Sequence, residues 1–277
     1  MDKSKELDQF YTNPKIAKRL LIKTKQIIKE KNIYWIEPSA GTGSFSDLLK
    51  KENLLAIDID PKQKDILKKN FLLDKIEEIE EIQKTENKII TIGNPPFGKK
   101  SSIAIKFFNK SAEISEYICF ILPKTFKKES IVNQLNEKMH KIYEEEIEKN
   151  SFIYKEKTYD VKCVFQIWKK EKTKRKKNKI KKETKLFKFV KKEESEFAIR
   201  RVGGLTGKLL DNKDYKKYSE SSNYFIKTNE TSISKQELKN KIKKNYEKIQ
   251  EKAKDTVGNP SISRNELIRI LEEDEIN

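Results

Sequence analysis

Residues 33–45 read IYWIEPSAGTGSF, an apolar run that leads into a glycine turn. The run predicts a buried β-strand, and the segment after the turn predicts a short helix. Gly41 and Gly43 lack a Cβ, so the backbone can turn tightly there and a ligand can approach it closely. In open α/β sheets, ligands bind at the carboxyl ends of the strands. The stretch therefore predicts an α/β fold with a ligand site directly after this strand.

Residues 54–60, LLAIDID, predict the next strand, which ends in acids. Asp58 stands 21 residues after Glu37, where a carboxylate can accept hydrogen bonds from ribose hydroxyls. Asp60 precedes Pro61 and is the expected cap of a following helix. The dinucleotide fingerprint requires a third glycine, and Ser46 stands in its place. Glu37 would repel a pyrophosphate but suits an ammonium group, so the pattern favours S-adenosylmethionine over NAD.

The sequence Asn94-Pro95-Pro96-Phe97 follows the β-branched run KIITI. Two prolines at a strand exit fix the backbone and leave its carbonyls as acceptors. The side-chain oxygen of Asn94 and the carbonyl of Pro95 can together accept both hydrogens of an –NH2 group, and Phe97 offers a flat face to a heterocycle. We expect these residues to present an amine nitrogen to a methyl donor. A rigid turn without a substrate is the alternative.

Strand and helix patterns alternate through the first part of the chain, which predicts a mostly parallel, doubly wound sheet. Asn13 and Pro14 are typical of a helix start. Further helices are expected at 61–69, 74–84, 101–115 and 129–139. A short strand is expected at 70–73, and further strands at 117–122, 142–152 and 162–168, of which the last two would form an antiparallel hairpin. Beyond a glycine turn, the end of the chain predicts helices at 235–252 and 263–273.

These motifs resemble the class I amino-methyltransferases that carry the (Asp/Asn/Ser)-Pro-Pro-(Tyr/Phe) motif. Gln9-Phe10-Tyr11-Thr12 is similar to the N-terminal cofactor motif of the adenine-N6 DNA methyltransferases. Asn70-Phe71-Leu72-Leu73 is similar to the motif after their third strand, where the family usually has Asp at the position of Asn70. The resemblance implies a Rossmann-like, mostly parallel seven-stranded sheet with a C-terminal antiparallel hairpin. It implies the cofactor S-adenosylmethionine and two sets of residues. The cofactor-binding set is Phe10, Tyr11, Thr12, Glu37, Ser39, Ala40, Gly41, Gly43, Asp58, Ile59, Asn70, Phe71 and Asn94, and the catalytic set is Asn94, Pro95, Pro96 and Phe97.

The chain also resembles the ribosomal-RNA adenosine-N6 methyltransferases. They share Thr12-Asn13-Pro14-Lys15-Ile16-Ala17, the acidic DID and NPPFG followed by lysine. The expected reaction is methylation of the N6 amine of adenine in DNA, with RNA as the alternative polymer. Phe152 or Tyr154 would form a second wall around a flipped base, or belong to the core. Two further readings stay open: a protein glutamine methyltransferase and a non-catalytic nucleic-acid-binding module.

Basic residues concentrate in one stretch. Residues 169–192 hold 14 basic and two acidic side chains and so carry +12 of the net charge of +18. Such a run can bind nucleic acid by displacing counterions from phosphates, or serve as a solvated linker or a nuclear address. We expect a methyltransferase domain at 1–168, a lysine-rich linker at 169–192 and a small basic α+β region at 193–277 for substrate recognition or interaction. A protein partner subunit stays open.

Other residues exclude some classes of site. Cys119 and Cys163 lie in apolar runs and are expected in the core, and His140 is the only histidine, so no metal site is expected. No apolar run is long enough for a membrane helix and no signal peptide opens the sequence, which indicates a soluble intracellular protein, cytoplasmic or nuclear.

Overall fold

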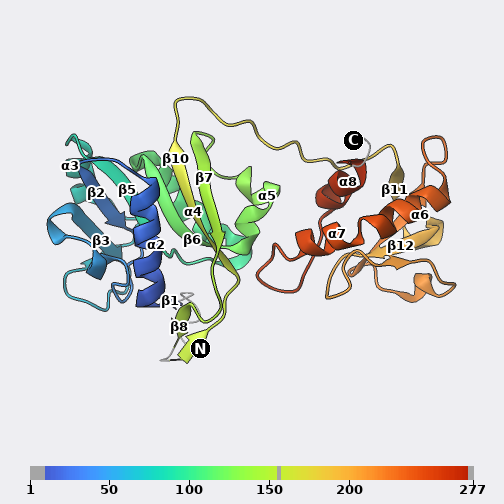
Figure 1. Cartoon of the computed structure of the whole chain (residues 1–277), viewed down its shortest axis with the longest axis horizontal. Helices are drawn as coiled ribbons and strands as arrows, with labels where there is room; N and C mark the ends of the chain where they lie inside the picture. Colours follow the sequence, from blue (N-terminus) through green and yellow to red (C-terminus); the bar gives the residue numbers. More distant parts are fainter. Residues whose placement is uncertain (1–9, 155–156, 274–277) are drawn as a thin grey trace. The chain divides into compact units, whose positions relative to one another are not determined.

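The computed structural model describes residues 10–154 and 157–273, and the chain divides into two compact units between Lys177 and Asn178. None of the helices in these described ranges is both long and apolar enough to cross a membrane. Each unit has its own sheet and hydrophobic core (Figure 1).

The first unit is built on a seven-stranded sheet with the order β4-β3-β2-β5-β6-β10-β7. The strands from β4 to β6 pair in parallel, and β10 runs antiparallel to both of its neighbours. The predicted seven-stranded, mostly parallel, Rossmann-like sheet with an antiparallel hairpin is confirmed. The strands are β2 (Ile33–Glu37), β3 (Leu54–Asp58), β4 (Leu67–Lys68), β5 (Lys88–Gly93), β6 (Tyr117–Pro123), β7 (Met139–Glu146) and β10 (Cys163–Lys170).

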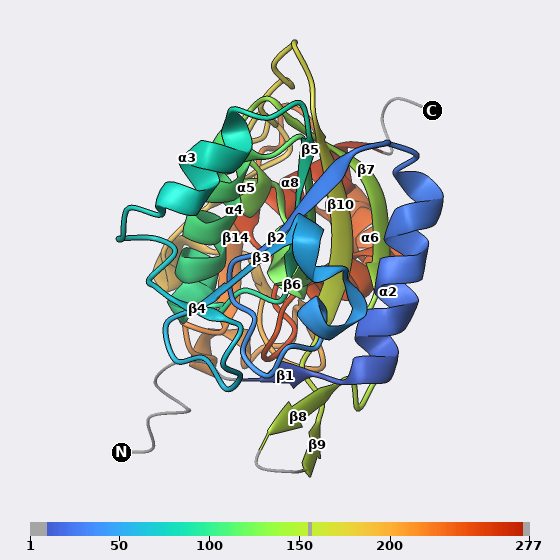
Figure 2. The ribbon, with the colours of Figure 1, turned by 90° about the vertical axis from the view of Figure 1, so that its left-hand side faces the viewer.

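Helices cover both faces of this sheet (Figure 2). Along β6, Cys119 and Ile121 pack with α2, while Phe120 and Leu122 pack on the opposite face with α4. This alternation is the period of two that a strand imposes on its side chains, and it buries the strand on both sides. The helices are α2 (Pro14–Ile27), α3 (Glu77–Gln83), α4 (Ser102–Ile114) and α5 (Glu129–Val132). As predicted, Asn13 caps α2, and its side chain accepts the N–H of Lys15 at 3.0 Å.

A small second sheet brings the N-terminal motif into the fold. Strand β1 (Tyr11–Thr12) pairs antiparallel with β8 (Phe152–Tyr154), which pairs with β9 (Lys157–Tyr159). The prediction of one strand over 142–152 is therefore wrong, because β7 ends at Glu146 and Phe152 begins a separate strand, β8, which pairs with β9. This hairpin fixes the position of the chain just before α2.

Four further local predictions are wrong. No helix follows Pro61; the backbone N–H of Lys62 donates to Gly41 and that of Lys69 to Asp58, so contacts with β3 and the glycine turn set this segment. Residues 70–73 form a turn rather than a strand. The helix expected over 129–139 stops at Val132, and the one expected after the glycine turn is two short 3-10 helices, Ser46–Leu48 and Lys51–Asn53.

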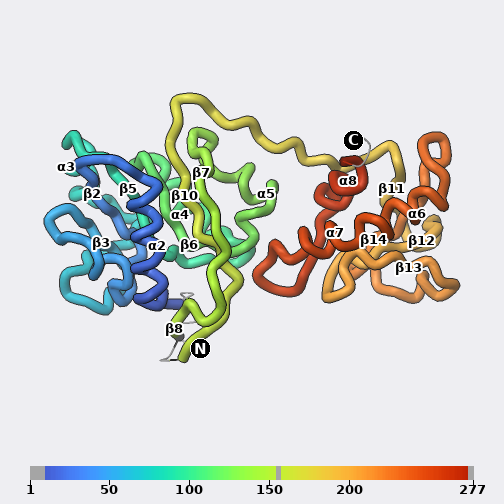
Figure 3. The backbone as a smooth tube through the Cα atoms, in the orientation of Figure 1, coloured from blue at the N-terminus to red at the C-terminus, as the bar shows by residue number. Residues whose placement is uncertain are grey.

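The second unit is a four-stranded antiparallel sheet, in the order β11-β14-β12-β13, with helices packed on it (Figure 3). Its strands are β11 (Phe187–Phe189), β12 (Phe197–Arg200), β13 (Leu209–Leu210) and β14 (Asn223–Thr228). Its helices are α6 (Lys235–Lys244), α7 (Tyr246–Ala253) and α8 (Arg264–Glu273), so the helix expected over 235–252 is two helices that meet at Asn245. Strands occupy both ends of the predicted linker, since β10 continues to Lys170 and β11 begins at Phe187.

Candidate active site

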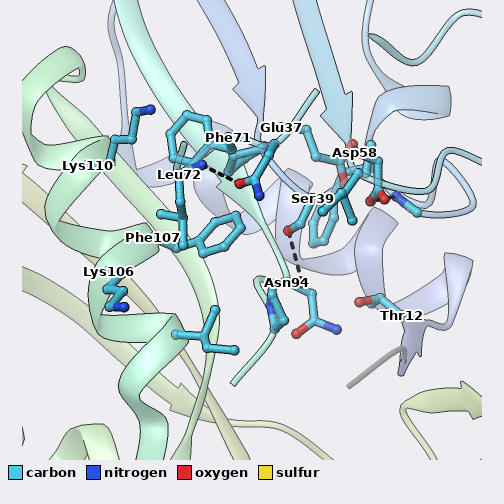
Figure 4. A pocket seen from close by; sticks show the side chains of 18 of the residues that line it. Thr12, Glu37, Ser39, Asp58, Phe71, Leu72, Asn94, Lys106, Phe107 and Lys110 are labelled. Carbon is cyan, nitrogen blue, oxygen red and sulfur yellow. Dashed lines mark hydrogen bonds between the residues drawn. The ribbon is translucent and has the colours of Figure 1, made fainter. Parts of the chain in front are cut away.

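The carboxyl ends of β2, β3 and β5 open onto a cavity of about 870 Å³ (Figure 4). This is the edge at which ligands bind in open α/β sheets. Every residue of the predicted cofactor-binding set except Gly43 lines it, as does Pro96 of the predicted catalytic set. The remaining lining residues, which belong to neither predicted set, are Pro38, Ser44, Phe45, Leu72, Leu73, Ile103, Lys106, Phe107, Asn109, Lys110 and Glu113.

The glycine turn forms the floor of the cavity beside β1. Gly41 has φ +55°, and a Cβ at this position would lie 2.8 Å from Cε1 of Tyr11. Both the conformation and the space therefore require glycine. Gly43 has φ +85° and shapes the turn without lining the cavity. The hydroxyl of Ser44 donates to the carbonyl of Thr12 at 2.7 Å, which joins the turn to the N-terminal strand.

Glu37, the last residue of β2, places a buried carboxyl group at the cavity, where it is 2% exposed. Burial raises its pKa well above the ordinary value, and Asp58 acts in the same direction, while hydrogen bonding to Ser46 opposes them. Among the described residues, its Oε2 has no hydrogen-bond partner. A buried carboxyl oxygen without a partner is costly, and a cationic donor in the cavity would remove that cost.

Asp58, at the end of β3, is held by two backbone groups. Its Oδ2 accepts the N–H of Gly41 and its Oδ1 accepts the N–H of Asp60, both at 2.8 Å. A carboxylate oxygen has two lone pairs, so each retains the capacity to accept one more hydrogen bond. Asp58 thus fixes the glycine turn and still presents acceptors to the cavity. Asp60 caps no helix; its carboxylate pairs with Lys62.

An aromatic wall closes the far side of the cavity. Phe71 is buried, and its ring centroid lies 5.4 Å from that of Phe107 on α4. The ammonium of Lys110 lies 5.2 Å from the centre of the Phe71 ring. Asn70 also lines the cavity, but its side-chain oxygen already accepts the N–H of Leu72 at 3.0 Å. Its amide nitrogen is the part of Asn70 with donor capacity for a ligand.

The side chain of Asn94 is oriented from the N-terminal segment. Its Nδ2 donates to the carbonyl of Phe10 at 2.9 Å. The backbone carbonyl of Asn94 accepts the hydroxyl of Ser39 at 3.2 Å. With the amide nitrogen engaged, the side-chain Oδ1 is the group turned to other donors. The ring of Phe10 stacks on Tyr159 of β9, with centroids 5.1 Å apart. Gln9 lies outside the described residues.

The remaining residues of the predicted catalytic set lie behind the cavity surface. Pro95 is buried and Phe97 is half-buried, and neither lines the cavity. Phe97 packs against the hydrophobic clusters on both faces of the sheet, and its carbonyl accepts the N–H of Ile103 at 3.1 Å. In this arrangement Phe97 supports the start of α4.

The candidates for a second aromatic wall have different outcomes. Phe152 is 1% exposed and belongs to the core cluster around α2, so its core reading holds and the wall reading is wrong. The side chain of Tyr154 lies outside the described part of the chain. Cys119 and Cys163 are buried and unpaired, as expected.

No protein-family model and no curated protein matches the chain. Solved structures match part of it. A Pyrococcus horikoshii protein provisionally described as an RNA methyltransferase is 21% identical with a TM-score of 0.42, and the match covers 59% of this chain and 87% of that one. A Thermoplasma acidophilum protein is 20% identical with a TM-score of 0.40, covering 57% and 90%. The 23S rRNA methyltransferase ErmE is 11% identical with a TM-score of 0.40, covering 60% and 71%.

Proposed function

We propose that the chain transfers a methyl group from S-adenosylmethionine to the N6 amine of an adenine in nucleic acid. One observation carries the proposal: three groups line a single cavity. They are the buried carboxyl of Glu37, the carboxylate of Asp58, whose oxygens can each accept one more hydrogen bond, and the side-chain amide of Asn94, which its bond to Phe10 orients. Each group matches a different part of the reaction.

Three features of the cavity fit the cofactor. The unpartnered Oε2 of Glu37 suits the ammonium of the methionine part. The remaining lone pairs of Asp58 suit the ribose hydroxyls, and the wall of Phe71 and Phe107 suits the flat face of an adenine. When bound, the cofactor supplies an electrophilic methyl group on a sulfonium. A cavity of about 870 Å³ leaves room for it.

The target amine would be held by acceptors at the end of β5. Asn94 Oδ1, at the cavity, accepts one of its hydrogens, and the backbone carbonyl of Pro95, a residue that does not itself line the cavity, accepts the other when the base is bound. The nitrogen lone pair is then directed at the methyl group. A new N–C bond forms as the S–C bond breaks, and the nitrogen then releases one proton to water. No general base is needed, because the nitrogen becomes acidic once it carries the methyl group. Positioning and desolvation are therefore the main contributions of these residues.

The choice between DNA and RNA as the substrate rests on less specific sequence motifs. The N-terminal motif and the order of motifs favour DNA, while the run from Thr12 to Ala17 and the lysine after NPPFG favour RNA. DNA is our first choice and RNA the second. The residues around Asn94 have the same role in both.

Labelled S-adenosylmethionine incubated with duplex DNA, single-stranded DNA and total RNA tests the proposal. Each polymer is digested to nucleosides, and the labelled product is identified by mass. N6-methyldeoxyadenosine supports the DNA reading, and N6-methyladenosine found only in RNA changes the polymer. Label on none of them, from protein that binds the cofactor, would contradict nucleic-acid methylation by the chain alone and leave a glutamine substrate, a partner subunit or a binding role.

A further inference from the structure

Three segments of the second unit meet at the edge of its sheet. The N–H of Ile262 donates to the carbonyl of Arg201 at 3.0 Å, and Val202 forms a β-bridge with Ser261. The hydroxyl of Tyr224 on β14 donates to the carbonyl of Ile262, also at 3.0 Å. These bonds fix the end of β12 against the start of α8.

The same contacts gather two arginines and two aromatic rings, which we call the Arg–aromatic cluster: Phe189, Arg201, Tyr224 and Arg264. The guanidinium carbon of Arg201 lies 5.0 Å from the centre of the Tyr224 ring. That of Arg264 lies 4.7 Å from the centre of Phe189 and 5.9 Å from that of Tyr224. A guanidinium over a ring is held in place without using its N–H donors. Both arginines thus keep donors for another partner.

Neither arginine makes an ion pair among the described residues of the second unit. The buried Nε of Arg201 has no hydrogen-bond partner there either. Glu266, the acid whose charge reaches Tyr224, directs Oε2 to Ser263, where it accepts the backbone N–H at 2.8 Å and the hydroxyl at 2.7 Å. Two guanidinium groups therefore lie beside one ring without an ion pair among the described residues of this unit, and an anion would be attracted to both.

The choice of residue and the surface beside it point to one class of anion. The chain has 62 basic residues, of which six are arginine, and four of these six are in the second unit. Arginine differs from lysine in offering a planar fork that binds a phosphate through two parallel hydrogen bonds. The glycines that follow the cluster are open: a Cβ at Gly203 or Gly204 would meet no atom within 4 Å. A phosphate backbone can therefore approach the chain closely at this point.

We propose that the Arg–aromatic cluster binds the phosphodiester backbone of the nucleic-acid substrate. The inference rests on the proposed function for the nature of the substrate, and it assigns the second unit a direct part in holding it. Arg201 and Arg264 contact phosphate oxygens, and Tyr224 and Phe189 keep the two guanidinium groups in position. The contact is independent of base sequence, as backbone contacts are.

The test measures binding by the full-length protein without S-adenosylmethionine, using labelled single-stranded RNA, single-stranded DNA and duplex DNA over a series of salt concentrations. The variants are Arg201→Gln, Arg264→Gln and the double variant, with Lys213→Gln as the control, since Lys213 is an exposed cation of the same unit. We expect the double variant to bind about tenfold more weakly and to lose about one to two units from the slope of log affinity against log salt. The control should change little.

Arg201→Lys separates phosphate binding from a structural role. It keeps the charge and loses the fork, so we expect binding between that of the wild type and Arg201→Gln with an unchanged melting temperature. Arg264 is exposed, and its single variant should fold normally. Equal affinity and slope for Arg264→Gln and Lys213→Gln would overturn the inference. The binding test contains no cofactor, so its result does not depend on whether the protein transfers methyl groups. If methyl transfer is observed but the arginine variants bind normally, the proposed role of the Arg–aromatic cluster is rejected and the proposed function is kept.

Discussion

The side-chain amide of Asn94 donates a hydrogen bond of 2.9 Å to the carbonyl of Phe10, which lies 84 residues earlier in the chain. The bond joins the exit of β5 to the segment that precedes α2. That segment is itself fixed, because β1 pairs with β8 and Ser44 bonds to Thr12. The amide of Asn94 therefore aligns two parts of the proposed reaction site. One is the exit of β5, which would hold the target amine, and the other is the segment around Phe10, which would lie beside the cofactor.

Replacing Asn94 by alanine should nearly abolish methyl transfer and weaken cofactor binding far less, through loss of the bond to Phe10. The variant loses the Oδ1 acceptor, and removing one such group from a reaction site typically costs about 10²–10³ in rate. Single-turnover transfer and calorimetric cofactor binding measure the two effects. The matched control is Asn87→Ala, since Asn87 directly precedes the first residue of β5, at the end away from the cavity. This variant should be as active as the wild type. Equal transfer by both variants would remove Asn94 from the proposed role.

Gly41→Ala should weaken cofactor binding and lower the free energy of unfolding by about 1–3 kcal/mol. The strain has two sources, since φ is +55° and the new Cβ would lie 2.8 Å from the ring of Tyr11. Gly258→Ala is the control, because a Cβ there would meet nothing within 4 Å. Denaturant unfolding and cofactor titration check the pair. If Gly41→Ala matches Gly258→Ala in both, the turn tolerates a side chain and the contact with Tyr11 has no consequence.

Much of this site follows from the sequence because its parts sit at strand ends. The runs that became β2, β3 and β5 are mostly apolar, and Glu37, Asp58 and Asn94 occupy or directly follow their last positions. Parallel strands bring such positions to one edge, so spacing along the chain becomes proximity in space. The helix over 101–115 was predicted, yet nothing local shows that Ile103, Phe107 and Lys110 line the cavity or that Phe107 meets Phe71.

The errors have a common physical origin in tertiary contacts. The segment after Pro61 has helical composition, but its backbone N–H groups donate to Gly41 in the glycine turn and to Asp58 at the end of β3, both of which line the cavity. Strand β8 pairs with β1, a partner at the other end of the unit's sequence. Local propensity is weak against such pairing. Both errors lie next to the cavity, where function constrains the backbone most.

The lysine run offers a separate test of nucleic-acid binding. Lys172, Lys176 and Lys182 are exposed, and replacing all three by glutamine should reduce the salt dependence of binding if the run contacts phosphates. The expected loss is about one unit of slope for each contact removed. Replacing the exposed Lys64, Lys68 and Lys213, which lie outside the run, is the control for the loss of three charges. The same slope for both triple variants would leave the run as a linker.

Glu37→Gln should change both stability and cofactor binding with pH. The unfolded carboxyl ionises near its ordinary pKa of 4.5, and burial raises the pKa of the folded group. Between these two values the folded state binds more protons than the unfolded state, so the stability contributed by Glu37 is present at low pH and is lost as pH rises through the raised pKa. The variant has no such group, so its melting temperature should fall less than that of the wild type over this window. The exposed Glu52→Gln control should follow the wild type.

Cofactor binding should show the opposite pH dependence. The ammonium of S-adenosylmethionine favours the ionised form of Glu37, so binding releases a proton and wild-type affinity rises with pH through the same window. In Glu37→Gln the affinity should be lower and nearly independent of pH there. Calorimetric titrations in buffers of different ionisation enthalpy count the released proton directly. Release of the same number of protons by the variant and the wild type would show that another group meets the ammonium, and the proposed part of Glu37 in cofactor binding would be rejected.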